Sequence, residues 1–189
     1  MIKTSLFADQ EREAKLNKLG DALRVMEQHV DFAALADEVD RAAPRPSRER
    51  GGRPPFPTEL MVRVLLIQQL FNLSDEQMEF QLLDRLSFQR FVGLRASSQI
   101  PDRTTIWIFK ERLIKAGASE SIFDAVSEQL SKHGYIARVE HVFAGLAQLG
   151  GKSLRSIGLA RATLQINWKV AAYNLRRLVY LKEAMIEAF

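Results

Sequence analysis

Apolar residues recur at helical spacing near the start of the chain. The recurring residues are separated by 3, 4 and 3 positions and have charged residues between them: Leu16, Leu19, Leu23 and Met26. This period is that of one helix face, so the sequence predicts a helix over residues 9–29. A second, shorter helix is expected over residues 31–40. Together they form the predicted N-terminal segment, residues 1–43.

Proline, glycine and arginine dominate residues 44–57 and predict a linker without regular structure. A helix is expected to follow over residues 58–72, with Thr58 as its N-cap. Only Glu59 and Arg63 are charged in that stretch, and a helix that is apolar on nearly all sides belongs at the centre of a bundle.

Capping signals divide the next region into further helices. Ser74 and Gln77 have capping-box spacing and predict a helix to about residue 84, followed by a short apolar segment over residues 86–94. Asp102 is expected to cap a helix that stops at Gly117, with Ile106, Trp107 and Phe109 in the core. Ser119 is expected to cap one more helix, which directs four residues to the core: Ile122, Phe123, Val126 and Leu130.

A long final helix is predicted over residues 159–188, with two distinct faces. One face, the apolar stripe, contains Leu164, Trp168, Ala171, Leu175 and Leu178. The opposite face, the basic stripe, contains Lys169, Tyr173, Arg176 and Tyr180, with Arg177 at its edge. Basic residues interleaved with aromatics suit a phosphate backbone, but the solvated face of a dimer or bundle helix has the same pattern.

No segment alternates convincingly between apolar and polar residues, so the predicted fold class is all-α. The helical bundle over residues 58–135 and the remaining residues 136–189 complete the predicted organisation.

Charge is distributed unevenly around the net +4. Residues 1–40 hold 5 basic and 9 acidic residues, whereas residues 41–53 hold 5 arginines and one glutamate. Residues 135–189 hold 8 basic and 3 acidic residues. Positive charge concentrated in a linker and a tail points to a polyanionic partner.

The absence of cysteine excludes disulfides and thiolate metal sites, and the three scattered histidines do not favour a zinc site. Neither a membrane span nor a signal-peptide core is recognisable, so a cytoplasmic, nucleoid-associated protein is expected.

Four stretches resemble DDE transposases of the bacterial insertion sequence five family, in the family's order. They are Arg53-Pro54-Pro55-Phe56-Pro57, Leu73-Ser74-Asp75-Glu76-Gln77, Asp84 to Leu94, and Pro101-Asp102-Arg103-Thr104-Thr105-Ile106. A fifth, Ala137-Arg138-Val139-Glu140-His141-Val142-Phe143, resembles the segment that carries the family's catalytic glutamate. The resemblance covers about residues 3–135, which match the family's N-terminal region, and 138–181, which match its extreme C-terminal part. It implies that residues 136–189 are a remnant of the C-terminal part of the catalytic domain.

The resemblance implies an internal deletion that removes the RNase H-like catalytic sheet. Glu140 would be a relic of the catalytic glutamate, and the two preceding aspartates of the family have no counterpart; no aspartate follows Asp124. The two-metal mechanism requires the whole carboxylate set. We therefore expect no enzymatic activity and no cofactor, with Mg²⁺ expected only for an intact family member.

The resemblance also implies a helix-turn-helix-like region over residues 58–135. Arg103, Thr104 and Thr105 would then face DNA, at a helix N-terminus that presents free amides to phosphate. The alternative is that Asp102 and Thr105 are simple capping partners and Arg103 is a surface charge. Further expected DNA contacts are linker residues Arg45, Arg48, Arg50 and Arg53 and final-helix residues Lys169, Tyr173, Arg176 and Arg177.

The sequence therefore predicts a truncated transposase that binds the terminal inverted repeats of its parent element and regulates the full-length enzyme. One alternative is a helical dimerisation module that interferes with full-length transposase without binding DNA. Another is a decayed gene product with no function. Because the apolar stripe lost its family partner with the catalytic sheet, pairing of that stripe with a second copy is favoured over folding back.

Overall fold

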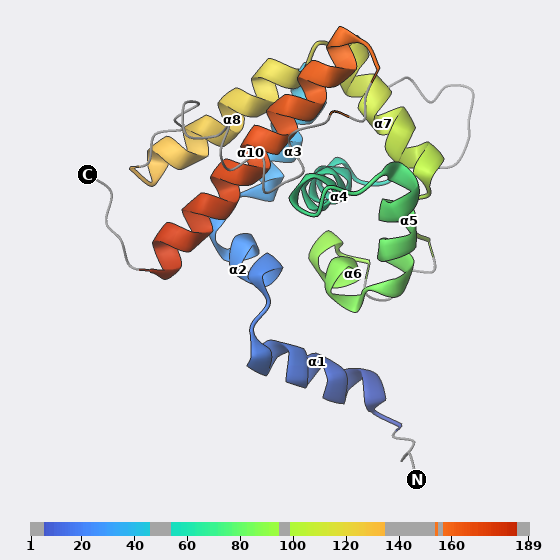
Figure 1. The fold of residues 1–189 in the computed structure, drawn as a ribbon, viewed down its shortest axis with the longest axis vertical. Coiled ribbons are helices and arrows are strands. Elements are labelled where there is room, and N and C mark those ends of the chain that lie inside the picture. Colours follow the sequence, from blue (N-terminus) through green and yellow to red (C-terminus); the bar gives the residue numbers. More distant parts are fainter. Residues whose placement is uncertain (1–5, 46–53, 95–98, 135–153, 155–156, 185–189) are drawn as a thin grey trace.

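The computed structural model describes residues 6–45, 54–94, 99–134, 154 and 157–184. These residues contain helices and no strand, so the all-α prediction is confirmed for this part of the chain (Figure 1). The helices are α1 (Ala8–Leu19), α2 (Ala22–His29), α3 (Phe32–Ala42), α4 (Thr58–Leu70), α5 (Asp75–Asp84), α6 (Leu86–Val92), α7 (Arg103–Lys115), α8 (Ser119–Lys132) and α10 (Leu159–Glu183).

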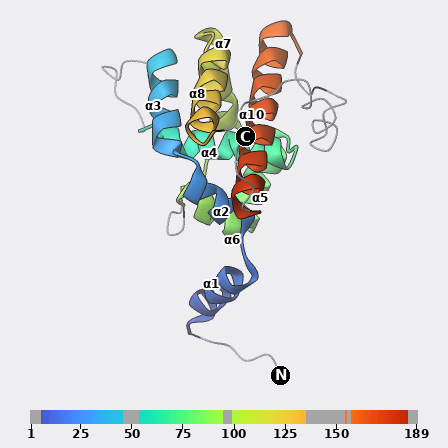
Figure 2. The same ribbon diagram turned by 90° about the vertical axis from the view of Figure 1, so that its left-hand side faces the viewer.

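Helix α4 lies at the centre, as its apolar sequence predicts. Val62, Val64 and Ile67 on different sides of this helix are all fully buried. Helices α3, α8 and α10 stand side by side, and α4 lies across them and packs against α3 and α10 (Figure 2). Thr58 is not the N-cap: Pro57 precedes the helix, and the Thr58 hydroxyl donates to Asp40 of α3 instead.

Helices α5, α6 and α7 form the flank of the bundle, and two predicted capping signals are confirmed there. Ser74 and Gln77 form a reciprocal capping box at the start of α5. Asp102 accepts a hydrogen bond from the Thr105 amide at 2.7 Å at the start of α7.

The prediction for Ser119 is wrong. Helix α8 already begins at this residue, Ala118 stands at the cap position, and no side chain caps the helix. Within α8, Ile122, Val126 and Leu130 are buried as predicted. Phe123 is only half-buried, where it packs with residues of α10.

The predicted helix over residues 9–29 is divided in two. Gly20 has φ +83°, a conformation that favours glycine, and Asp21 caps the new helix α2. Leu23 of α2 is buried, but Leu19 of α1 remains 83% exposed. As a result α1 projects from the bundle near the N-terminus (Figures 1 and 2).

Helix α10 packs against α8, α4, α2 and α7 of the same chain. All five residues of the apolar stripe are buried and belong to one core with residues of α2 to α8. The expectation that this stripe pairs with a second copy is therefore corrected, because it already folds back onto its own chain. No helix in the described part of the chain is long and apolar enough to cross a membrane.

Candidate nucleic-acid interface

The N-terminus of α7 carries the three residues predicted to read DNA. Arg103 and Thr104 are exposed and Thr105 is half-buried. The Arg103 amide donates to Glu79 Oε2 at 3.0 Å, and the Thr105 amide donates to Asp102. Two of the amides expected to be free for a phosphate are thus already satisfied by carboxylates.

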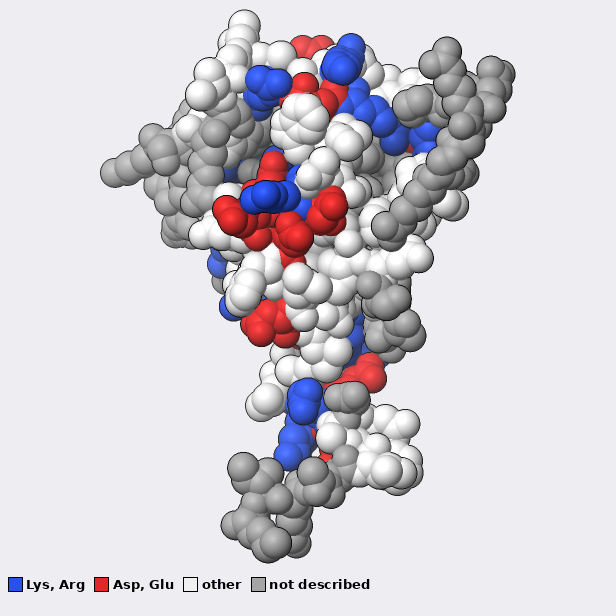
Figure 3. All heavy atoms as spheres, turned by 90° about the vertical axis from the view of Figure 1, so that its right-hand side faces the viewer, with Lys and Arg blue, Asp and Glu red and all other residues white. Residues whose placement is uncertain are grey.

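Acidic side chains surround this helix start. Arg103 Nη1 lies 3.7 Å from Glu76 Oε1, and Asp75 of the same helix α5 pairs with Lys110 of α7. Figure 3 shows acidic side chains gathered at the middle of the face formed by α5 and the start of α7. These acidic side chains would repel a phosphate backbone that approached Arg103 on this face.

Trp107, predicted to be in the core, is 50% exposed, and its neighbour Ile108 is also exposed. Ile106 and Phe109 are buried as expected. The outer face of α7 is therefore more apolar than the sequence pattern indicated.

Trp107 also borders a cavity of about 440 Å³ between α4, α5, α7 and α10. At its edge, Arg161 Nε of α10 donates to Glu111 Oε1 of α7 at 2.7 Å. This hydrogen bond lowers the pKa of Glu111 and raises that of Arg161. The pair joins the tail to α7, and no local sequence signal connects residues so far apart.

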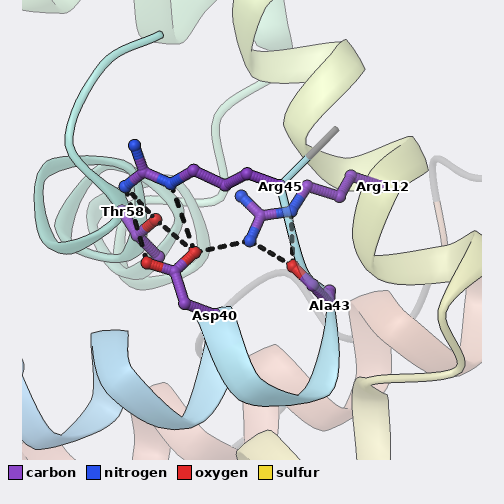
Figure 4. Close-up of polar contacts among 5 residues, drawn as sticks. All are labelled: Asp40, Ala43, Arg45, Thr58 and Arg112. Carbon is purple, nitrogen blue, oxygen red and sulfur yellow. Dashed lines mark hydrogen bonds and ion pairs between the residues drawn. The ribbon is translucent and has the colours of Figure 1, made fainter. Parts of the chain in front are cut away.

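Arg45, predicted to contact DNA from the linker, lies in a polar cluster at the end of α3 (Figure 4). Its Nη2 donates to Thr58 Oγ1 at 2.6 Å, and its Nε lies 3.4 Å from Asp40 Oδ1. Arg112 of α7 donates to the same Asp40 oxygen at 2.6 Å and to the Ala43 carbonyl. Arg45 is thus engaged with a carboxylate of its own chain.

Opposing effects act on the pKa of the Asp40 carboxyl. Burial raises this pKa, but hydrogen bonds from Arg112, Thr58 and Arg45 together outweigh burial and hold it below its ordinary value. Asp40 is therefore a carboxylate that ties α3, α4 and α7 together, and it was not recognised from the sequence because its partners are distant along the chain.

The basic stripe of α10 is only partly available to a ligand. Lys169 is 1% exposed, which corrects its predicted role as a phosphate contact. Tyr173 is half-buried and packs beside Val170 and Phe123. Arg176 and Arg177 are exposed and remain available.

The predicted contacts Arg48, Arg50 and Arg53 and the relic Glu140 lie outside the described residues. Within the described ranges, no group of three or more histidine, aspartate or glutamate side chains is arranged to hold a metal ion.

Comparison with known proteins identifies the family of this chain. A family described as "Transposase domain (DUF772)" matches residues 10–112, which run from α1 into α7. No solved structure matches the chain.

Proposed function

Because the chain belongs to the transposase-domain family DUF772, we propose that it is a truncated, non-catalytic transposase that binds the ends of its parent element. By occupying those ends, or by joining assemblies of the full-length enzyme, it would regulate transposition.

The observation that carries this proposal is the position of α10. Its apolar stripe is buried against helices α2, α4 and α7 of the family region and against α8. A shortened chain whose tail covers its own core can fold without a catalytic sheet, because no large apolar face of α10 is left in water. This supports a folded regulator over a decayed gene product.

The sequence supports the absence of catalysis. Strand cleavage and joining by two metal ions require several carboxylates around one site. Glu140 has no aspartate between it and Asp124, and Asp124 is an exposed residue of α8. Nicking of an element-end duplex in the presence of Mg²⁺, lost on Glu140→Gln, would contradict this part of the proposal.

The exposed arginines of α10 are the best supported phosphate contacts. Arg176 and Arg177 adjoin on the helix surface, and the segment from residue 135 onward has an excess of 5 positive charges (8 basic, 3 acidic). The linker arginines Arg48, Arg50 and Arg53 would add further contacts. Arg103 can act as a base reader once it leaves Glu76, because an exposed ion pair is weak.

Fluorescence anisotropy with two labelled duplexes tests the proposal. One duplex carries the terminal repeat of an intact element from this family, and the other has the same composition in scrambled order. We expect tighter binding to the repeat, and weaker binding to both duplexes at about 200 mM than at about 50 mM salt. Equal, negligible binding to both duplexes at low salt would contradict DNA binding.

Variants separate the roles of the two helices. Arg176→Ala should weaken binding to both duplexes alike and reduce the salt slope by about one unit. Arg103→Ala should cost roughly 1–3 kcal/mol at one base position of the repeat alone. Arg41→Ala, at an exposed position of α3, is the matched control and should change neither quantity.

A second candidate function is a dimerisation module that acts without DNA. The acidic surroundings of Arg103 favour it, since they oppose a phosphate backbone at α7. Co-expression with full-length transposase distinguishes the two candidates. Inhibition that persists in a variant unable to bind DNA would favour the module.

A further inference from the structure

Helix α1 is exposed and lightly held. Arg90 of α6 donates to Asn17 Oδ1 at 2.6 Å and lies 3.7 Å from Glu13 Oε1. Arg24 of α2 donates to the same Asn17 oxygen at 2.7 Å. These contacts fix one side of α1, whereas Leu19 at its end is exposed to solvent.

A different side of α1 carries a basic and apolar face. Its residues follow the spacing i, i+3, i+4 and i+7, which places them on one side of a helix: Arg12, Lys15, Leu16 and Leu19. Arg12, Lys15 and Leu19 are exposed and Leu16 is half-buried. We call this set the α1 face.

The outer side of α5 repeats that spacing with the opposite charge. The residues, which we call the α5 face, are Glu76, Glu79, Phe80 and Leu83. Phe80 is 61% and Leu83 58% exposed, whereas Met78 and Leu82 on the inner side are fully buried. Helix α5 therefore exposes to solvent two large apolar side chains that its own bundle does not cover.

The two faces are complementary position by position. Each begins with two like charges and ends with two apolar residues, and the charges of the two faces are opposite. Within one chain, α1 projects away from α5 (Figures 1 and 2). Figure 3 shows acidic side chains over α5 and basic side chains on α1 on the same side of the molecule. Two copies that meet on this side can form the contact twice, as a closed two-fold dimer requires.

We propose that the α1 face of one copy docks on the α5 face of a second copy, and reciprocally. Docking buries Leu16 and Leu19 against Phe80 and Leu83, while the basic and acidic halves pair at the rim. Both faces belong to the region matched by the family. The contact requires no DNA and therefore stands apart from the proposed DNA-binding function.

Sedimentation of the purified full chain without DNA tests this docking. We expect a concentration-dependent dimer that weakens as salt rises. Arg12→Glu and Glu76→Lys should each weaken it about tenfold, because each places like charges across both contacts. Arg41→Glu on α3, the matched charge reversal, should leave it unchanged.

The decisive experiment is sedimentation of a mixture of the two single charge-reversal variants. In the mixed pair, Glu at position 12 of one chain faces Lys at position 76 of the other, and the second contact keeps both native residues. The mixture should therefore regain the affinity lost by each variant alone. Leu19→Ser should remove the dimer by an independent route while the circular dichroism spectrum and melting temperature stay those of the unmodified chain.

Three results would overturn the proposal. A monomeric unmodified chain at all concentrations would show that the faces do not pair. A dimer indifferent to Arg12→Glu, Glu76→Lys and Leu19→Ser would place the interface elsewhere. Variants that lose the dimer but do not recover on mixing would exclude reciprocal docking of the α1 face on the α5 face.

Discussion

The two helices nearest the ends of the chain, α1 and α10, carry leucines at helical spacing but use them differently. In α10 the apolar stripe is buried by α8, α4, α2 and α7. In α1, Leu19 lies in water because Gly20 turns the chain away from the bundle. The tail thus completes the helical body, by which we mean α2 to α8 together with α10, whereas α1 keeps an exposed apolar residue that the proposed docking would cover. Association is therefore expected through α1, although the sequence pattern favoured the tail.

The largest expected difference is in the free energy of unfolding, between a variant at a buried leucine of α10 and a variant at an exposed leucine of α1. Leu175→Ala should lower the free energy of unfolding by about 2–5 kcal/mol, because it leaves a cavity in a packed core. Leu19→Ala should change it by less than about 0.5 kcal/mol. Urea unfolding followed by circular dichroism measures both. Similar values for the two variants would abolish the distinction between the helices.

A polar contact of the helical body should respond more weakly than its core. Arg112→Ala removes hydrogen bonds to Asp40 and to the Ala43 carbonyl and should cost about 1–3 kcal/mol of unfolding free energy. Hydrogen exchange of α1 amides should remain as in the unmodified chain. If exchange in α1 increased as much as exchange in the helical body, α1 and the body would unfold together.

A smaller effect on stability is expected from a change in pH. Because the folded state lowers the pKa of Asp40, its stabilisation is fully present above the ordinary carboxyl pKa of about 3.9 and is lost as pH falls through the lowered value. Asp40→Asn should make the urea midpoint fall less steeply below about pH 4. The effect is small because Asp40 is partly exposed. An unchanged acid slope would show that Asp40 contributes nothing to this dependence.

The smallest change in global stability is expected when the contacts between α1 and the helical body are removed. Arg90→Met removes the contacts to Asn17 and Glu13 while keeping an apolar stem. Exchange of α1 amides should accelerate, and the melting temperature should fall less than in Leu175→Ala. A loss of stability as large as that of Leu175→Ala would indicate that α1 is part of the body.

Signals that act over a few residues were predicted well. The capping box of Ser74 and Gln77 and the Asp102 cap rely on hydrogen bonds three residues apart, which the sequence displays directly. Thr58 failed as a cap because its hydroxyl binds Asp40, eighteen residues away. The leucine period hid the break at Gly20, since the same spacing continues on both sides of it.

The candidate site depended more on tertiary contacts and was predicted less well. A helical wheel placed Lys169 beside Arg176, but packing buries Lys169 and leaves Arg176 exposed. The sequence marked Arg103 as a base reader without revealing that Glu76 and Glu79 would lie beside it. Charged residues can be counted from the sequence, but the fold determines which of them lie beside one another.

Native-state hydrogen exchange most directly tests the central claim that the tail closes the helical body within one chain. Amides over residues 164–178 of α10 should be as protected as those of α4 and α8, at low and high protein concentration and in the Arg12→Glu variant. Amides of α1 should exchange much faster. Exchange of α10 at the rate of α1, or protection of α10 that appears only at high concentration, would contradict the account.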